Sequence, residues 1–228
     1  MDLLSEDTLQ WSPIVANSSM NRERNASGIN SYEKEFKFKP QDFLEQKLKE
    51  FGSASWLDLC CGKGNALIQT AEYLSQKGLL ENVKLKGIDL LDFFAPKHSH
   101  INNIEFSIGS IIDWKPDSTY DLITCSHGLH YIGDKLHVVE SAVGALNPHG
   151  LFIANMDLSN IYITGQNSEL YIKKLLKLNK LDYNNRTKIL KKTGGETIQF
   201  NLVYKGADDK TGPNYTGQDA VTSYYSIK

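Results

Sequence analysis

The feature that most constrains the fold of this chain is a regular alternation of short apolar runs with amphipathic runs. The strand-like runs are SWLDLC, VKLKGIDL, IEFSIGS, YDLITCS and GLFIANMDL, and the segments NALIQTAEYLSQKG and KLHVVESAVGAL between them have helical spacing. Strands joined by helical crossovers run parallel, and the helices then cover both faces of the sheet. We therefore expect an α/β fold, a three-layer αβα sandwich.

The segments on either side of this alternation differ from it. Residues 1–38 are polar and have no sustained period, so we expect them to form an N-terminal arm or lid, with residues 39–228 as the folded domain. The run PQDFLEQKLKEF predicts an amphipathic helix that begins at Pro40 and ends just before Gly52. Near the C-terminus, the runs TKILKKT and TIQFNLVYK are separated by two glycines, which predicts an antiparallel hairpin.

Charge and cysteine content exclude several classes of protein. Lys and Arg total 25 against 27 Asp and Glu, which argues against a generally basic surface for nucleic acid. The three cysteines are an odd number without zinc-site spacing, so we expect a reducing compartment. No run approaches the roughly 18 apolar residues of a membrane span, and the acidic N-terminus is unlike a signal peptide. A cytoplasmic protein without membrane contact is expected.

The segment WLDLCCGKGNAL, residues 56–67, carries the first candidate binding residues. Asp58 lies near the end of an apolar strand, Gly62 and Gly64 form a tight turn, and a helix starts at about Asn65. Glycines in such a turn let the backbone approach a ligand whose polar groups face the amides of the helix start. An ordinary strand-to-helix turn remains the alternative at this loop.

A second acidic residue favours a ligand that carries a nucleoside. Asp89 ends the next strand, where a carboxylate can accept both hydroxyl hydrogens of a ribose; the alternative is a simple turn cap. Leu67 stands where a dinucleotide fingerprint has its third glycine, and Asp58 would repel a pyrophosphate but suits a cationic ligand. These features favour S-adenosylmethionine over a nicotinamide cofactor.

Five segments in order resemble the class I S-adenosylmethionine-dependent methyltransferases, over most of residues 40–206. LDLCCGKGN is similar to the first motif of that family, with Cys60 in place of its first glycine. The segments IDL, IEFSIGSIIDW, YDLITCSHGLHYIGD and LNPHGLFIANMDL resemble the ends of the second to fifth strands. The resemblance implies a methyltransferase with a seven-stranded, mostly parallel sheet, whose last strand, at about residues 197–205, is antiparallel.

The resemblance also implies which residues bind S-adenosylmethionine. Asp58, Gly62 and Gly64 would hold the methionine portion, Asp89 the ribose, and Leu90 the adenine. Ser110 stands where the family often has an aspartate, and a serine hydroxyl accepts a hydrogen bond more weakly. Because Cys60 stands at the position of the first glycine, we expect its backbone φ angle to be one that a residue with a side chain tolerates. The full set of cofactor-binding candidates is Asp58, Cys60, Gly62, Gly64, Asp89, Leu90, Ser110, Ile111 and Ser126.

The loop SHGLHYIGD after the fourth strand supplies the candidate for proton transfer. His127 would face the substrate and could remove its proton, whereas His130 matches a pattern typical of a packed core histidine. Many methyltransferases need alignment alone, so a catalytic base remains one of two alternatives. The catalytic candidates are His127 and Tyr32, and the substrate-binding candidates are Arg22, Asn30, His127, Tyr131 and Tyr215.

We expect methyl transfer to an oxygen or nitrogen of a small molecule or peptide, by a monomer or homodimer. The loop lacks the [DN]-P-P-[YFW] pattern of amide and base amino-group methyltransferases, so nucleic acid is not the favoured substrate. One alternative is a methyltransferase of the same fold that acts on RNA or protein through the Lys-rich segment 171–192. A non-catalytic nucleotide-binding module or an NAD-type oxidoreductase is the other. No metal is predicted.

Overall fold

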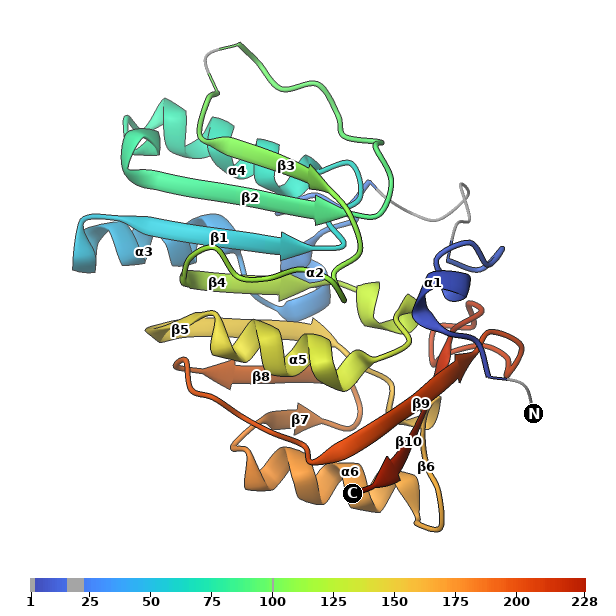
Figure 1. Cartoon of the computed structure of the whole chain (residues 1–228). Helices are drawn as coiled ribbons and strands as arrows, with labels where there is room; N and C mark the ends of the chain where they lie inside the picture. Colours follow the sequence, from blue (N-terminus) through green and yellow to red (C-terminus); the bar gives the residue numbers. More distant parts are fainter. Residues whose placement is uncertain (1–2, 16–22, 100) are drawn as a thin grey trace.

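The computed structural model describes residues 3–15, 23–99 and 101–228. Seven strands form the main sheet in the order β3-β2-β1-β4-β5-β8-β7 (Figure 1). The parallel strands of the alternating region are β1 (Ala54–Leu59), β2 (Val83–Asp89), β3 (Ile104–Ile108), β4 (Tyr120–Cys125) and β5 (Leu146–Asn155). The chain proceeds outward from β1 to β3 and then returns to β4 on the other side of β1. The strand order therefore reverses between β1 and β4, and ligands of such sheets bind where this happens.

The last strand of the main sheet is antiparallel, as expected, but it is a different segment. β8 (Ile189–Thr193) pairs antiparallel with β5 and with β7 (Asp182–Asn184). The expected strand at about residues 197–205 is wrong. Gly194 and Gly195 donate their N–H groups to the carbonyls of Gly150 and Asn147, so the chain after β8 continues along the turn that opens β5 instead of reversing.

The hairpin turn lies earlier, between β7 and β8. The side chain of Asn184 accepts hydrogen bonds from the N–H groups of Arg186 and Thr187, at 3.0 and 3.1 Å. An asparagine that bonds the backbone two residues ahead closes a turn without glycine. This local hydrogen bonding explains why two adjacent glycines were a misleading signal for the hairpin.

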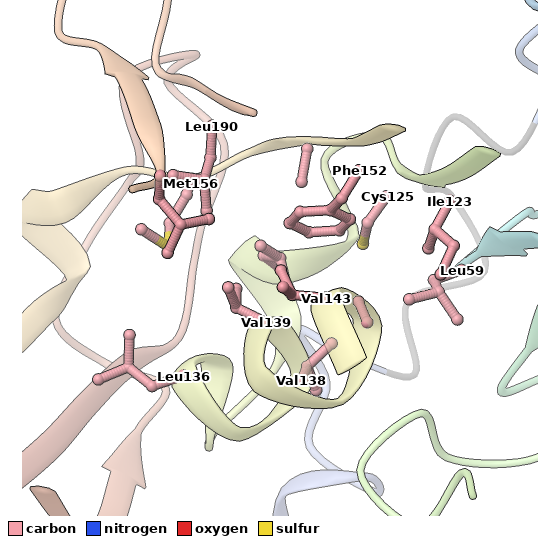
Figure 2. Packing of buried hydrophobic residues seen from close by; sticks show 14 of the residues in the cluster. Leu59, Ile123, Cys125, Leu136, Val138, Val139, Val143, Phe152, Met156 and Leu190 are labelled. Carbon is pink, nitrogen blue, oxygen red and sulfur yellow. The ribbon is translucent and has the colours of Figure 1, made fainter. Parts of the chain in front are cut away.

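Helices cover both faces of the main sheet, which confirms the three-layer sandwich. On one face, α3 (Pro40–Phe51) and α4 (Asn65–Gln76) pack Leu44 and Leu67 against Trp56. On the other face, α5 (Lys135–Gly144) packs Val139 and Val143 into a cluster with strand residues such as Leu59, Ile123, Cys125 and Phe152 (Figure 2). Alternate residues of a strand point to opposite faces, so Trp56 and Asp58 lie on the α3 side of β1 and Leu57 and Leu59 on the α5 side.

A second sheet, absent from the sequence-based expectation, joins the two ends of the chain. β10 (Thr222–Ile227) pairs parallel with β6 (Ile161–Ile163) and antiparallel with β9 (Leu202–Asp208). Leu4 and Ala207 exchange both backbone hydrogen bonds, at 2.8 and 3.0 Å. This bridge places α1 (Glu6–Leu9) beside β9 (Figure 1).

Five further helical elements complete the described parts of the chain. They are α2 (Tyr32–Phe36), α6 (Ser168–Leu178), and the 3-10 helices η1 (Leu80–Asn82), η2 (Gly128–Tyr131) and η3 (Leu158–Asn160). The α2 segment of the arm belongs to the core, since Tyr32 and Phe36 are buried and the Tyr32 ring meets Trp56 edge-on at 5.8 Å. No helix within the described ranges is long and apolar enough to cross a membrane.

Candidate functional site

A cavity of about 360 Å³ opens at the carboxyl ends of the central parallel strands. Its walls come from the loops after β1, β2, β3 and β4, from the arm, and from the segment before β10. Its position matches the reversal of strand order between β1 and β4, and its size is that of a small-molecule site. We expect a bound ligand to contact all of these loops at once.

The glycine-containing loop after β1 forms one wall. Gly64 has φ +72°, and a Cβ there would lie 2.3 Å from the Phe106 ring, so only glycine fits. Cys60 has φ +57°, in the left-handed region, which costs a residue with a side chain more than it costs glycine. Gly128 makes room for the Cys60 side chain, because a Cβ on Gly128 would lie 2.5 Å from the Cβ of Cys60.

Asp89 lines the cavity and is held in place by backbone groups. Gly62 N–H donates to its Oδ2 at 2.8 Å, and Leu91 N–H donates to its Oδ1 at 3.3 Å. A carboxylate oxygen has two lone pairs, so each oxygen of Asp89 keeps one with which to accept a hydroxyl hydrogen. These two acceptor positions fit a ribose with two adjacent hydroxyls.

The wall beyond Asp89 is mixed apolar and polar, a composition that fits a planar heterocyclic ring. Leu90 and Ile111 line the cavity together with Ser110, whose Oγ accepts a hydrogen bond from Ile112 N–H at 3.3 Å. Ser126 also lines the cavity, and its hydroxyl oxygen is buried without a hydrogen-bond partner in the described ranges. A buried hydroxyl without a partner is costly, so this atom marks a place where a ligand can supply the missing bond.

Asp58 does not line the cavity, although we expected it to contact the ligand directly. It is fully buried, and its carboxylate accepts hydrogen bonds from Tyr32 at 2.7 and 2.8 Å and from Thr124 at 2.6 Å. Burial raises the pKa of Asp58 to about 7, and the hydrogen bonds from Thr124 and Tyr32 oppose that rise. Tyr32 lines the cavity and donates to Asp58, so the acid holds a residue of the cavity wall in place.

Tyr32 lines the cavity, but its chemistry differs from that of a base. Burial and the neighbouring Asp58 carboxyl raise the pKa of Tyr32 well above its ordinary value, and its proton is donated to Asp58. A hydroxyl of this kind is a poor proton acceptor. The geometry therefore supports a lining and packing role for Tyr32.

A polar cluster of Arg24, Glu35, His127 and Asn155 lies at the arm side of the site. Glu35 Oε2 lies 3.2 Å from His127 Nε2 and 3.5 Å from Arg24 Nη1, and Asn155 Nδ2 donates to Glu35 Oε1 at 2.7 Å. Burial alone would raise the pKa of Glu35, but His127, Asn155 and Arg24 together lower it to about 2. Arg24, Glu35 and His127 line the cavity, so this end of it holds a carboxylate anion.

Sequence reasoning missed Glu35 and Asn155. Glu35 lies in the charged run YEKEF, which resembles an ordinary exposed helix turn, and Asn155 lies at the end of a strand assigned to the core. The only available signal was position, because Asn155 ends β5 at the same sheet edge as His127. A contact across 120 residues has no signature in local spacing.

Of the remaining candidate residues, one lines the cavity and the others lie outside its lining or outside the described residues. Tyr131 lines the cavity, and its hydroxyl donates to Gln218 at 3.2 Å. Tyr215 stands behind the wall, where Asn155 Nδ2 donates to its hydroxyl at 3.1 Å. Gly64 and Asn30 also lie outside the lining, and Asn30 donates to the Glu23 carbonyl at 3.1 Å. Arg22 lies outside the described residues.

Two further observations bear on the expectations for this site. Burial lowers the pKa of His130 to about 3, so this histidine, beside the cavity lining, is neutral. Residues 3–15, 23–99 and 101–228 contain no group of three or more His, Cys, Asp or Glu that could hold a metal ion.

Comparisons with known proteins agree on one family. The family described as "Methyltransferase domain" matches residues 30–189. Two demethylmenaquinone methyltransferases, from Bacillus licheniformis and Lysinibacillus sphaericus, are 29% and 28% identical to the chain over 102 residues. Each match covers 42% of this chain and 42% of the relative, so the matched region spans less than half the length of these curated relatives.

The solved structures similar to the chain include several methyltransferases and the [4+2]-cyclase SpnF. The N-methyltransferase NodS from Bradyrhizobium japonicum WM9, in complex with S-adenosylhomocysteine, is 13% identical, with a TM-score of 0.41, covering 68% of this chain and 85% of that one. The amino pentose methyltransferase CalS10 from Micromonospora echinaspora is 18% identical, with a TM-score of 0.39, covering 50% and 48%. The fold assignment of this chain rests on its own strand order and directions.

Proposed function

The chain belongs to the methyltransferase domain family, and from this premise we propose that it transfers a methyl group from S-adenosylmethionine to an oxygen or nitrogen of a small molecule or peptide. The observation that carries the proposal is Asp89. Its carboxylate lies at the carboxyl end of β2, lines the cavity, and keeps one acceptor position on each oxygen. This is the arrangement that binds a ribose in open parallel sheets.

The other walls suit the remaining parts of the same cofactor. Leu90 and Ile111 provide apolar surface for adenine, and the unpartnered Ser126 hydroxyl offers a hydrogen bond. When bound, S-adenosylmethionine supplies an electrophilic methyl group on a positively charged sulfur. The carboxylate of Asp89 makes this part of the cavity favourable for a cation.

The arm limits what the acceptor can be. Leu9 and Val15 line the cavity from the arm, and the bridge between Leu4 and Ala207 anchors α1 beside it. With the arm along its wall, the cavity has dimensions that favour a small molecule or a single side chain. The net charge of -2 adds no attraction for a polyanion. A small molecule or peptide is therefore the proposed acceptor.

Calorimetric titration with S-adenosylmethionine, S-adenosylhomocysteine and NADH tests the proposal. We expect binding of both sulfur ligands with a dissociation constant on the order of micromolar, the range of ordinary enzyme ligands, and none of NADH. The Asp89→Ala variant should lose this binding, whereas Asp92→Ala, an exposed aspartate three residues away, should retain it. Binding of NADH alone, or of neither sulfur ligand, would overturn the proposal.

A further inference from the structure

Resting on the proposed function, we propose that Glu35 is a positioning residue that sets His127 as the proton acceptor for a hydroxyl or protonated amine of the methyl acceptor. The two residues come from different parts of the chain. Glu35 lies in α2 of the arm, and His127 is the residue that precedes η2 after β4. Both line the cavity, and 18% of the His127 side chain is exposed.

Three residues form a closed ring of contacts that holds the imidazole. Glu35 Oε2 lies 3.2 Å from His127 Nε2, and Glu35 Oε1 accepts from Asn155 Nδ2 at 2.7 Å. Asn155 Oδ1 in turn accepts from the backbone N–H of His127 at 3.2 Å. Asn155 thus connects the carboxylate and the backbone of the same histidine, which restricts both the place and the rotation of the ring.

The backbone around His127 is itself constrained. His127 has φ +59°, an angle that few residues other than glycine adopt, and such strain persists where the surroundings enforce it. The next residue must be glycine, because a Cβ on Gly128 would lie 2.5 to 2.8 Å from atoms of Cys60 and Cys125. On the other side, the Tyr215 ring stacks on His127 with centroids 6.3 Å apart. The turn therefore presents the ring in one orientation.

The carboxylate selects the tautomer of His127. Because Glu35 remains ionised, it acts only as an acceptor, so His127 must carry its proton on Nε2. Nδ1 then keeps the lone pair that takes up a proton. The titratable and charged groups around the ring are Glu35, Arg24, His130 and Tyr215, and Glu35 is the anion in contact with it.

Methyl transfer to a hydroxyl or protonated amine releases a proton, and His127 is placed to accept it. A hydroxyl oxygen of the acceptor gives the electron pair of the new bond to the methyl carbon, the carbon–sulfur pair stays on sulfur, and the hydroxyl proton goes to His127 Nδ1. A protonated amine gives its proton to Nδ1 first, and this frees the lone pair. In both cases the resulting imidazolium is paired with the Glu35 carboxylate.

The decisive measurement is the tautomer of His127, read from imidazole 15N resonances assigned with His127→Gln. The wild type should show the Nε2–H form. In Glu35→Gln, the amide oxygen stays with the Asn155 amide and the NH2 group faces His127 Nε2, so the ring should change to the Nδ1–H form. Glu33→Gln, on the same helix, should keep the wild-type tautomer. An Nδ1–H form in the wild type, or no change in Glu35→Gln, would refute the assignment.

Kinetics separate this proposal from the function on which it rests. With an acceptor found among phenols, alcohols and primary amines, Glu35→Gln should lower kcat by about 100-fold or more, the range of general base catalysis, with little change in the KM of the cofactor. Glu35→Asp should restore part of the loss. In calorimetric titration, Glu35→Gln should bind S-adenosylhomocysteine with the same affinity as the wild type. If the wild type fails to bind this ligand, the proposed function fails, while the tautomer result stands separately.

Discussion

The hydroxyl of Tyr32 donates to both carboxylate oxygens of Asp58, at 2.7 and 2.8 Å. This contact joins the arm to the end of β1, where the glycine loop begins. Thr124 of the neighbouring strand donates to the same carboxylate, and Trp56 Nε1 donates to Thr124 at 2.8 Å. The buried acid is therefore the centre of a polar network, and the arm is part of the wall of the site.

Replacement of Tyr32 by phenylalanine should destabilise the fold. The change removes one donor from a buried carboxyl group, and an unsatisfied buried acceptor costs about 1–3 kcal/mol. Tyr73→Phe is the control, since it removes a hydrogen bond to Glu45 at the partly exposed surface and should cost less. Urea unfolding measures both, and equal losses for the two variants would contradict the network.

The raised pKa of Asp58 makes stability depend on pH. The carboxyl titrates near 7 in the folded protein and near 3.8 when unfolded, so between these values the folded state binds more protons. The contribution of Asp58 to stability is therefore present below about pH 4 and is lost as the pH rises to about 7. Asp58→Asn should remove this part of the pH profile. Urea unfolding of both proteins at pH 4.5 and 7.5 measures it, and parallel profiles would argue against a raised pKa.

Lys135 should produce a pH dependence in a different window. Its ammonium nitrogen donates to the carbonyls of Ile132 and Val221 and to Ser223 Oγ, at 2.7 to 2.8 Å, which connects the start of α5 to β10. Burial lowers the pKa of Lys135 to about 7. Between pH 7 and about 10.5 the folded state binds fewer protons than the unfolded state, so stability should increase across this window.

The variant Lys135→Met isolates this effect, because it keeps a long side chain without the amine. The free energy of unfolding of the wild type should increase between pH 7 and pH 9.5, and that of Lys135→Met should not. Lys84→Met, at an exposed lysine, should retain the increase. A gain of equal size in all three proteins would place its source elsewhere in the chain.

Gly128→Ala should disturb the loop that carries His127. The added Cβ would lie 2.5 Å from the Cβ of Cys60, and overpacking of this kind costs about 1–3 kcal/mol. Gly144→Ala is the matched control, because it meets open space at the end of α5 and should be neutral or stabilising. Thermal unfolding compares the two variants. Similar melting temperatures would show that the loop with Cys60 moves enough to accommodate the added methyl group.

Calorimetry with S-adenosylhomocysteine adds a second measurement on the same pair. Because Cys60 and Gly128 both line the cavity, we expect Gly128→Ala to weaken binding by at least 10-fold, about 1.4 kcal/mol. Gly144→Ala should bind as the wild type does. Unchanged affinity in Gly128→Ala would show that the contact between residues 60 and 128 does not affect ligand binding.

The sequence by itself determined the local elements and the side of the sheet on which the site lies. The alternation of apolar and amphipathic runs predicts β1 to β5 with their helices, because side-chain periodicity depends only on near neighbours. Gly62 and Asp89 were found in the same way, since each ends or follows a strand and the carboxyl ends of parallel strands share one edge. The antiparallel last strand came from family resemblance, and its position was wrong.

Only the tertiary structure decided which distant segments meet. Leu4 pairs with Ala207, and Glu35 reaches Asn155 across 120 residues. Neither the spacing nor the composition of the arm distinguishes Glu35, which lines the site, from Glu33, which pairs with Lys39. The difference arises from packing, because the burial of Tyr32 and Phe36 turns one face of α2 inward and carries Glu35 to His127.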